Sequence, residues 1–513
     1  MIRIGIDVGG TNTDAVIMKD GTVLHSIKEP TSSDVLSGVL GALEGVIQGS
    51  GIDRLDIDAV MIGTTHFTNA VVQRRDLAKT AAVRLGLPAT ASLPPLVDWP
   101  EELRQALGNH VFLAHGGHEF DGREISALDP DELRGIGRQI RELGIDTVAI
   151  SSVFSPVNTD MEARAAAILR EELPDASFTL SSDIGRIGLL ERENAAIMNA
   201  CLQALSERTI KAFREALRRA GISAPFYLTQ NDGTLMNADH AEKFPVLTFA
   251  SGPTNSMRGA AYLSGIKDAV VIDVGGTTTD VGALHNGFPR EASVAVEVGG
   301  VRTNFRMPDV FSIGLGGGSI VGGEPLTVGP QSVGYQLTER ARVFGGDTLT
   351  ATDVAVAGGA IALGDAGRLA DVQPAQMEEA RSVMAGMFDR AVERMLLSPE
   401  PIPVLVVGGG SILVPDSVAG LQVLRPDHYP VANAVGAAIA QISGEVDRVF
   451  ALAEMTRDEA VAAAKVEAIE RAVAAGADSD TTKVVDVDDV PLAYLPGNAT
   501  RIRVKAVGDL RGN

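Results

Sequence analysis

The residues best suited to chemistry occur twice, in one repeated eight-residue phrase. Residues 7–14 read DVGGTNTD and residues 273–280 read DVGGTTTD, so the copies share seven of their eight letters. Each copy joins two β-branched runs, which predicts a hairpin with two glycines in its turn. Such glycines let backbone N–H groups converge on an anion, whereas a carboxylate ahead of the turn suits Mg²⁺. The repeat therefore predicts a site for a polyphosphate and Mg²⁺.

This repeat and two glycine-rich loops supply the candidate site residues. Asp7 and Asp273 are the candidate Mg²⁺ ligands and are also candidate catalytic residues. The candidate phosphate-binding residues are Gly9, Gly10, Thr11, Asn12, Thr13, Gly275, Gly276, Thr277 and Thr278. Further nucleotide-binding candidates are Gly316, Gly317, Gly318, Gly408, Gly409, Gly410 and Ser411. The loop at Gly408 follows a predicted strand and would let adenosine approach the backbone, although a tight strand-to-helix turn explains it too.

Composition excludes several classes of function. The net charge of −22 and the pI near 4.8 argue against a nucleic-acid partner. No apolar run approaches the roughly 20 residues that a membrane span needs, and no signal peptide is expected. Cys201 is the only cysteine, which excludes an intramolecular disulfide and a cysteine-rich metal site. We therefore expect a cytoplasmic protein.

The elements that must position these residues fall into two halves and a short tail. Residues 1–265 and 266–450 each open with the phrase and continue as alternating strands and helices. This pattern predicts an α/β protein with two similar lobes around a cleft that holds the nucleotide. Residues 451–513 are predicted to form a small α+β appendage, with a helix over 456–475 and strands over 483–487 and 501–507.

This layout resembles the actin-like ATPase superfamily, whose ribonuclease-H-like lobes also occur in sugar kinases and Hsp70 chaperones. Further motifs along the chain are Gly63-Thr64-Thr65, Gly117-His118-Glu119, Glu191-Arg192, Gln230 with Asp232-Gly233, Ser251-Gly252-Pro253 and Thr352-Asp353. Their order resembles the hydantoinase/oxoprolinase family in particular. Phe311 stands where members of that family commonly carry a histidine. The resemblance implies ATP-dependent opening of a cyclic amide such as a hydantoin or 5-oxoproline, with a separately encoded hydrolytic subunit as an expected partner.

The implied mechanism phosphorylates the carbonyl oxygen of the ring, after which water opens the ring. Thr64 and Thr65 are candidates for the substrate side of the γ-phosphate, and helix capping is their equally weighted alternative. Glu193 and Asn194 are candidates for holding the amide or the attacking water, although such a pair is more often structural. His115, His118 and Glu119 lack the helical spacing of a zinc motif, so we interpret them as loop residues.

Other functions fit the same nucleotide site. The alternatives are a small-molecule kinase, a ketone-carboxylase-type subunit, and a nucleotide-driven switch without small-molecule turnover. The expected partners are a small cyclic amide and further subunits of an oligomer, with no nucleic acid and no membrane.

Overall fold

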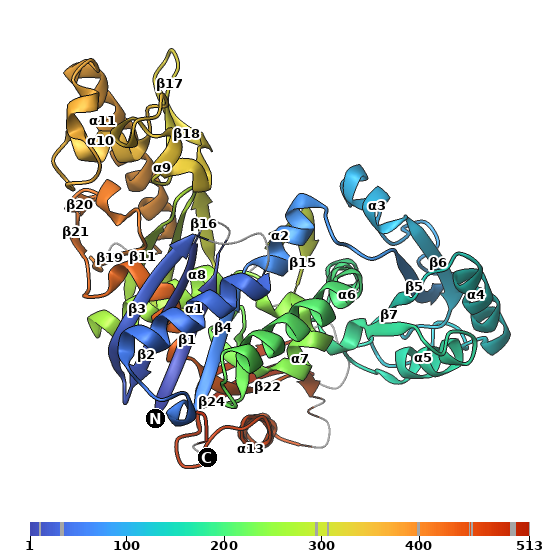
Figure 1. The fold of residues 1–513 in the computed structure, drawn as a ribbon. Coiled ribbons are helices and arrows are strands. Elements are labelled where there is room, and N and C mark those ends of the chain that lie inside the picture. Colours follow the sequence, from blue (N-terminus) through green and yellow to red (C-terminus); the bar gives the residue numbers. More distant parts are fainter. Residues whose placement is uncertain are drawn as a thin grey trace.

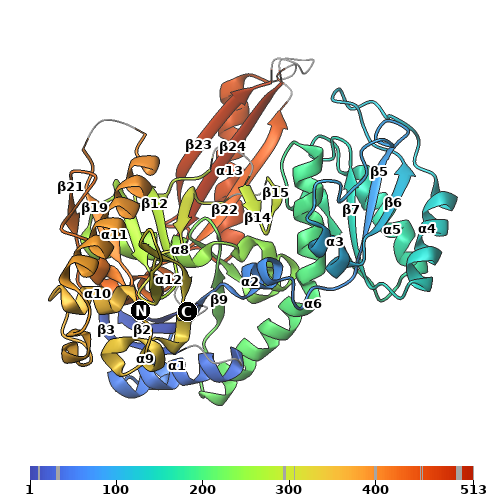
Figure 2. The same cartoon turned by 90° about the horizontal axis from the view of Figure 1, so that it is seen from above.

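The computed structural model describes residues 1–9, 12–30, 35–292, 296–304, 307–397, 401–450, 452, 455–492 and 499–511. Most of the described chain forms two lobes built on two sheets (Figure 1). A third sheet is inserted into the first half of the chain. Figures 1 and 2 place the second lobe and this inserted sheet on opposite sides of the first lobe.

The first lobe is built on a sheet in the order β23-β24-β22-β10-β9-β4-β1-β2-β3. In chain order its strands are β1 (Ile2–Val8), β2 (Asn12–Lys19), β3 (Thr22–Pro30), β4 (Ala59–Thr64), β9 (Phe226–Thr229), β10 (Thr234–Asn237), β22 (Gln441–Phe450), β23 (Lys483–Pro491) and β24 (Thr500–Gly508). Its helices are α1 (Val35–Ser50), α2 (His66–Gln73), α6 (Leu189–Arg219), α7 (Ala238–Lys243) and α13 (Arg457–Ala474). The aliphatic side chains of β1, β2 and β4 pack against α1 and α6, which gives this lobe its core.

The second lobe is built on a sheet in the order β13-β12-β11-β19-β21-β20, with β16 paired to β12. Its strands are β11 (Ala269–Val274), β12 (Thr279–His285), β13 (Phe288–Pro289), β16 (Val310–Ile313), β19 (Val404–Val407), β20 (Ser417–Val418) and β21 (Leu421–Leu424). Its helices are α9 (Leu337–Arg340), α10 (Ala351–Ala357) and α11 (Pro374–Met395). Two short ladders lie outside this sheet. Strands β17 (Ser319–Gly322) and β18 (Thr327–Ser332) pack on the second lobe, whereas β14 (Val296–Val298) and β15 (Val301–Thr303) pack against α2 and α6 of the first lobe.

The two lobes share one topology. Five strands of each sheet correspond, namely β3-β2-β1-β4-β9 in the first lobe and β13-β12-β11-β19-β21 in the second. In each set the first three strands are antiparallel to one another, and the last two run parallel to the central strand. This is the ribonuclease-H-like arrangement, so the predicted fold class is confirmed.

Two small-residue helices, α8 (Ser251–Ser264) and α12 (Ala432–Ala438), lie between the lobes. A Cβ on Gly259 would lie 1.9 Å from the Ala432 carbonyl oxygen, and one on Gly436 would lie 1.8 Å from that of Asn255. The two helices can therefore cross with their backbones in contact. Helix α12 packs on β1 and β2, while α8 packs on the second sheet.

The inserted sheet is parallel throughout, in the order β6-β5-β7-β8. It contains β5 (Thr80–Leu87), β6 (His110–His115), β7 (Thr147–Ser152) and β8 (Ser177–Leu180), together with α3 (Glu101–Leu107), α4 (Pro130–Glu142) and α5 (Asp160–Glu172). Strands and helices alternate along this part of the chain, which is the order that a parallel sheet requires.

The C-terminal strands extend the sheet of the first lobe. Strands β22, β24 and β23 are antiparallel to one another, and β22 pairs in parallel with β10. Helix α13 covers them, and Figure 2 shows these strands projecting from the body of the molecule. The region predicted as an appendage over 451–513 therefore shares its sheet with the first lobe.

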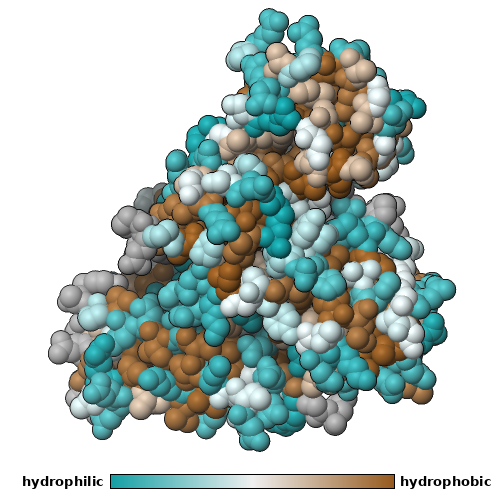
Figure 3. Space-filling model, turned by 90° about the vertical axis from the view of Figure 1, so that its left-hand side faces the viewer, coloured by the Kyte–Doolittle hydropathy of each residue, from teal (hydrophilic) through white to brown (hydrophobic). Residues whose placement is uncertain are grey.

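No helix among the described residues is long and apolar enough to cross a membrane. The face of the molecule in Figure 3 mixes hydrophilic and hydrophobic residues over the second lobe and the elements beside it.

Candidate nucleotide site

The two copies of the repeated phrase fold into the same hairpin. In β1–β2, Asp7 pairs across the strands with Asp14, and in β11–β12, Asp273 pairs with Asp280. The turns also match, because Gly9 N–H donates to the Asn12 carbonyl at 3.0 Å and Gly275 N–H donates to that of Thr278 at 2.9 Å. Each lobe therefore presents a glycine turn flanked by two carboxylates.

Both hairpins line one cavity of about 370 Å³ between the lobes. Among the predicted residues, those that line it are Gly9, Asn12, Gly275, Gly276, Thr277, Thr278, Gly317, Gly408, Gly409 and Gly410, together with Asp273. The structure also places Asp14, Lys28, Ser256, Thr352 and Asn433 in its wall. Gly10 and Thr11 lie outside the described residues. The cavity thus brings together the two copies of the repeat and two separate glycine-rich loops.

Asp7 is a buried carboxylate that is held by amides. It is 4% exposed, and it accepts hydrogen bonds from Asn255 Nδ2 at 3.3 Å and from Asn433 Nδ2 at 3.0 Å. Asn433 Nδ2 also donates to Asp14, at 2.7 Å. Burial and the neighbouring charge of Asp14 raise the pKa of Asp7 to about 6. A cation beside Asp7 would therefore be bound favourably, because it would offset a charge that burial disfavours.

Asp273 has a similar environment in the second lobe. Ser256 Oγ donates to its Oδ2 at 2.6 Å, and burial raises the pKa of Asp273. Gly408 packs directly against this carboxylate, since a Cβ there would lie 2.3 Å from Asp273 Oδ1. Burial also raises the pKa of Asp280, to about 6.

Lys28 supplies a positive charge to the cavity wall. Its Nζ lies 2.5 Å from Asp14 Oδ1, and its side chain is 32% exposed. Among the described residues that line the cavity, Lys28 is the only lysine or arginine. A triphosphate would bring several negative charges to this wall, so Lys28 can pair with either Asp14 or the ligand.

The two glycine-rich loops support the second hairpin. Gly317 N–H donates to the Gly275 carbonyl at 3.0 Å, and Gly318 N–H donates to that of Gly276 at 2.8 Å. Gly410 N–H donates to the Val274 carbonyl at 2.8 Å. Gly316, Gly318 and Ser411 thus lie behind the residues that face the cavity.

Thr64 and Thr65 lie at the Asp7 end of the first hairpin. Thr64 Oγ1 accepts from the N–H of His66, the first residue of α2, at 3.1 Å. Thr65, the N-cap residue of α2, makes no side-chain capping bond, and its Oγ1 donates to the Val8 carbonyl at 3.4 Å. A Cβ on Gly252 would lie 3.5 Å from Thr65 Cγ2 and 4.0 Å from Asp7 Oδ2. The start of α8 therefore approaches both Thr65 and Asp7.

Glu193 and Asn194 are engaged elsewhere, at the junction with the inserted sheet. Arg84 Nε donates to Glu193 Oε2 at 2.7 Å, and Ser151 Oγ donates to the same oxygen at 2.5 Å. Asn194 accepts from Trp99 Nε1 at 2.6 Å and donates to the Arg302 carbonyl at 2.9 Å. The structure does not bring this pair to the cavity between the lobes.

The donor set fits Mg²⁺ held together with a nucleotide. No group of three or more His, Cys, Asp or Glu side chains suited to a metal occurs among the described residues. Mg²⁺ usually keeps several waters and takes one or two carboxylates plus phosphate oxygens. Asp7 and Asp273, each buried at the end of a glycine hairpin, fit that role. His115 and His118 contact Glu132 and Asn158 instead.

Sequence reasoning missed several residues of this site. Asp14 stands inside the repeated phrase, so the repeat itself carried the signal for it. Lys28 and Asn433 come from a strand and a helix that carry no motif, and Ser256 lies on α8 after the Ser251-Gly252-Pro253 motif without being part of it, so only the folded chain shows these three residues.

Comparison with known proteins identifies the family of this chain. Residues 3–173 match the family model of the hydantoinase/oxoprolinase N-terminal region, and residues 192–386 match that of hydantoinase/oxoprolinase. The gamma subunit of acetophenone carboxylase from Aromatoleum aromaticum is 29% identical over 69% of this chain and 52% of its own length. Caprolactamase subunit alpha from Pseudomonas jessenii is 27% identical over 76% of this chain and 60% of its own.

The solved structure of the ATP-dependent caprolactamase from Pseudomonas jessenii has the same fold, with a TM-score of 0.78 at 19% identity. The match covers 99% of this chain and 88% of that one. This chain spans 52% and 60% of the two relatives named above. The family models, which together match more than half of the chain, show that it belongs to the hydantoinase/oxoprolinase family.

Proposed function

We propose that this chain binds ATP with Mg²⁺ between its lobes and uses it to phosphorylate the carbonyl oxygen of a cyclic amide, which drives ring opening. The observation that carries the proposal is the single cavity lined by both glycine hairpins. Caprolactamase subunit alpha, a relative named for a cyclic-amide hydrolase, supports the choice of reaction.

The chain's own residues have distinct tasks in this proposal. Backbone N–H groups of the turns at Gly9 and Gly275 would bind phosphate oxygens, with Lys28 adding a positive charge. Asp7 and Asp273 would hold Mg²⁺, which supplies charge neutralisation when bound. The loop at Gly408–Gly410 would take the adenosine side. Most of the rate gain would come from positioning and charge stabilisation.

The acceptor would lie where Asp7, Thr65 and the start of α8 meet. Ala250, which precedes α8, makes no side-chain capping bond, and the first turn of α8 holds no acidic residue. A helix start of this kind favours negative charge on a transferring phosphoryl group. Thr65 lies beside the same point and is proposed to face the substrate.

The proposed reaction consumes two water molecules for each ATP. The ring carbonyl oxygen attacks the γ-phosphorus, and the bond from that phosphorus to the oxygen of ADP breaks. Water then adds to the activated carbon, and the ring C–N bond breaks as the nitrogen takes a proton. A second water releases phosphate from the resulting acyl phosphate, so ATP is consumed as the ring opens.

A carboxylase-type role is the second candidate. The observation that favours it is the similarity to the gamma subunit of acetophenone carboxylase, at 29% identity. The same site would then activate a ketone oxygen. Both relatives are named as subunits, which supports the proposal that this chain works with a separately encoded subunit.

An ATPase assay of the purified chain tests the proposal. ADP release should be stimulated by at least one of 5-oxoproline, hydantoin, N-methylhydantoin and caprolactam, with ring opening detected in the same sample. Stimulation by a ketone together with bicarbonate, and by no cyclic amide, would favour the carboxylase-type role instead.

A further inference from the structure

A second cavity, of about 790 Å³, lies between the second lobe and the C-terminal strands. The second lobe contributes the end of β12, β13 and the end of α11, and the first sheet contributes β23 and β24. Cavities of roughly 300–1,000 Å³ between domains, with apolar walls and a few polar groups, are common sites for small organic ligands. None of the described residues that line this cavity takes part in the proposed reaction.

Helix α8 separates this cavity from the nucleotide cavity. Ser256 faces the nucleotide side, where its Oγ donates to Asp273. Arg258 lies two residues further on, about 200° around the helix. Its guanidinium lies 3.8 Å from the ring centroid of Phe288, which lines the second cavity. The second lobe therefore contacts α8 on both sides, so a rotation about α8 that narrows one cavity widens the other.

The second lobe gives this cavity an apolar wall. Leu284 and Phe288 lie at one end of it, and Leu397 follows α11 at the other. Leu397 is 78% exposed, so the apolar wall continues to the mouth of the cavity. Val485 and Val507 contribute apolar surface from the C-terminal strands. An apolar ligand would thus be removed from water on two sides, which favours its binding.

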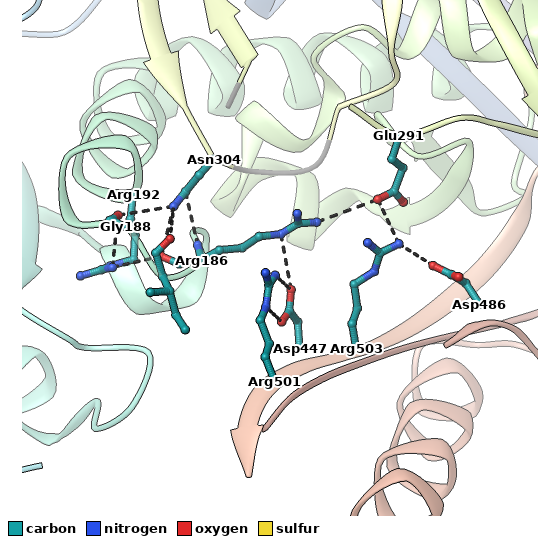
Figure 4. Close-up of polar contacts among 10 residues, drawn as sticks. Arg186, Gly188, Arg192, Glu291, Asn304, Asp447, Asp486, Arg501 and Arg503 are labelled. Carbon is teal, nitrogen blue, oxygen red and sulfur yellow. Dashed lines mark hydrogen bonds and ion pairs between the residues drawn. The ribbon is translucent and has the colours of Figure 1, made fainter. Parts of the chain in front are cut away.

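The charged side chains deeper in the cavity are already paired. Lys505 is 5% exposed, and its Nζ lies 2.6 Å from Asp232. Figure 4 shows Arg503 in contact with both Glu291 of the second lobe and Asp486 of β23. Because each of these two cations has a carboxylate beside it, this part of the wall offers a ligand no unbalanced positive charge.

Lys483 differs from these cations. It begins β23, it is exposed, and among the described residues no carboxylate pairs with it. Its partner across the strands is Val507, so its charge lies beside the apolar surface. Arg290, a further cation of the wall, lies 2.7 Å from Asp309. The cavity therefore combines apolar walls with one unpaired positive charge at its mouth.

We propose that this cavity binds an organic acid with an apolar body, with the body between the two walls and the carboxylate beside Lys483. Such a ligand would hold the second lobe and the C-terminal strands apart on this side of α8, and so favour the narrow form of the nucleotide cavity. The inference goes beyond the proposed function, because this acid is not the acceptor of the phosphoryl group.

Calorimetric titration of the full chain tests the site with octanoate and 1-octanol. The two probes have the same chain of eight carbons, and only octanoate carries a carboxylate. We expect octanoate to bind at least about threefold more tightly, as one exposed ion pair allows. Lys483→Gln should remove this preference, whereas Leu397→Ser should weaken both probes alike. The control Lys211→Gln, an exposed lysine on α6, should change neither.

A second titration tests the link across α8. A nonhydrolysable ATP analogue with Mg²⁺ should tighten octanoate binding, and octanoate should tighten binding of the analogue by the same factor. Octanoate binding that is sensitive to Lys483→Gln but unchanged by the analogue would overturn the link and leave the site in place.

The outcomes separate this inference from the proposed function. Equal binding of the two probes, or a preference that survives Lys483→Gln, would overturn the site whatever reaction the chain catalyses. If the analogue did not bind, the proposed function would fall, and the comparison of the two probes without nucleotide would still decide the site. Lys483 and Leu397 are both exposed, so the folded chain should tolerate each substitution.

Discussion

The buried charge of Asp7 lowers the free energy of unfolding when no cation is bound, and a cation beside it would offset that loss. Its pKa is raised to about 6, so between pH 4 and pH 6 the folded chain binds more protons at this residue than the unfolded chain does. The free energy of unfolding should therefore fall as pH rises through this range. For Asp7 alone the loss is about 3 kcal/mol. Urea unfolding between pH 4 and pH 7, without nucleotide, measures it.

The variant Asp7→Asn isolates this contribution. It cannot ionise, so its unfolding free energy should fall less with pH than that of the natural chain. The exposed Asp98→Asn should retain the natural pH dependence. Parallel profiles for the natural chain and Asp7→Asn would show that Asp7 has an ordinary pKa. The Mg²⁺-dependent ATPase of Asp7→Asn should be lost under all these conditions.

Substitutions at Lys28 can separate its effect on stability from its effect on nucleotide binding. In Lys28→Met, the buried carboxylate of Asp14 loses its cationic partner, which should cost about 3 kcal/mol of unfolding free energy. The same variant should raise the KM for ATP about tenfold, the usual size of one lost charge contact. The double variant Lys28→Met/Asp14→Asn should recover the stability, because no buried charge remains unpaired, and keep the high KM. Recovery of both quantities would mean that Lys28 only neutralises Asp14.

At the residue scale, the sequence predicts the site residues that belong to the repeated phrase, and it does not predict contacts between residues that lie far apart in the chain. Gly9, Gly275 and Asp273 were predicted because the phrase occurs twice, and the structure places them in one cavity. Glu193 was predicted, together with Asn194, to hold the amide or the attacking water, and the fold instead pairs Glu193 with Arg84, which lies 109 positions away. A single sequence does not contain that pairing.

The loop after β19 offers a matched pair of glycines at the scale of one element. Gly408 has φ +88°, and a Cβ there would lie 2.5 Å from the Val274 carbonyl oxygen. Gly408→Ala should therefore cost more than about 2 kcal/mol of unfolding free energy and disturb Asp273. At Gly409, the nearest atom to a Cβ is Lys28 Cε at 3.8 Å. Gly409→Ala should keep the natural stability and weaken nucleotide binding, because its new methyl group faces the cavity.

Urea unfolding and titration with a fluorescent ATP analogue distinguish these two effects. If both variants lost stability alike, the loop would be a tight turn without a role in the cavity. If neither affected binding, the adenosine would have to lie elsewhere.

The sequence predicts a helix or strand correctly where the spacing of apolar residues within one short segment defines it. The helix expected over 456–475 is α13 at Arg457–Ala474, and its buried face is a stripe of Ala460, Ala464, Ala468 and Ala472. The strands expected near 483 and 501 are β23 and β24. Their place in the first sheet was not predicted, because it depends on pairing between β10 and β22, which are about 200 residues apart and carry no matching pattern.

At the scale of the whole molecule, the C-terminal strands are linked to the nucleotide site through α12. That helix carries Asn433, which donates to both Asp7 and Asp14, and the chain passes from α12 directly into β22. Strand β22 is in turn held between β10 and β24 and covered by α13. A substitution that moves α13 away from β22 should therefore weaken nucleotide binding, although it lies far from the nucleotide site.

Gly444 of β22 is the position that tests this link, because α13 packs on it without space for a methyl group. A Cβ there would lie 2.2 Å from the Ala468 carbonyl oxygen and 2.3 Å from the Ala472 nitrogen. Gly444→Ala should push α13 away, lower the free energy of unfolding by about 2 kcal/mol and weaken binding of the ATP analogue, with faster amide exchange in α12. In the control Gly135→Ala on α4, the nearest atom to the new methyl group is 3.9 Å away, so stability and binding should be maintained or slightly improved. If Gly444→Ala loosened α13 alone and left nucleotide binding unchanged, the C-terminal strands would behave as an independent appendage despite sharing the sheet.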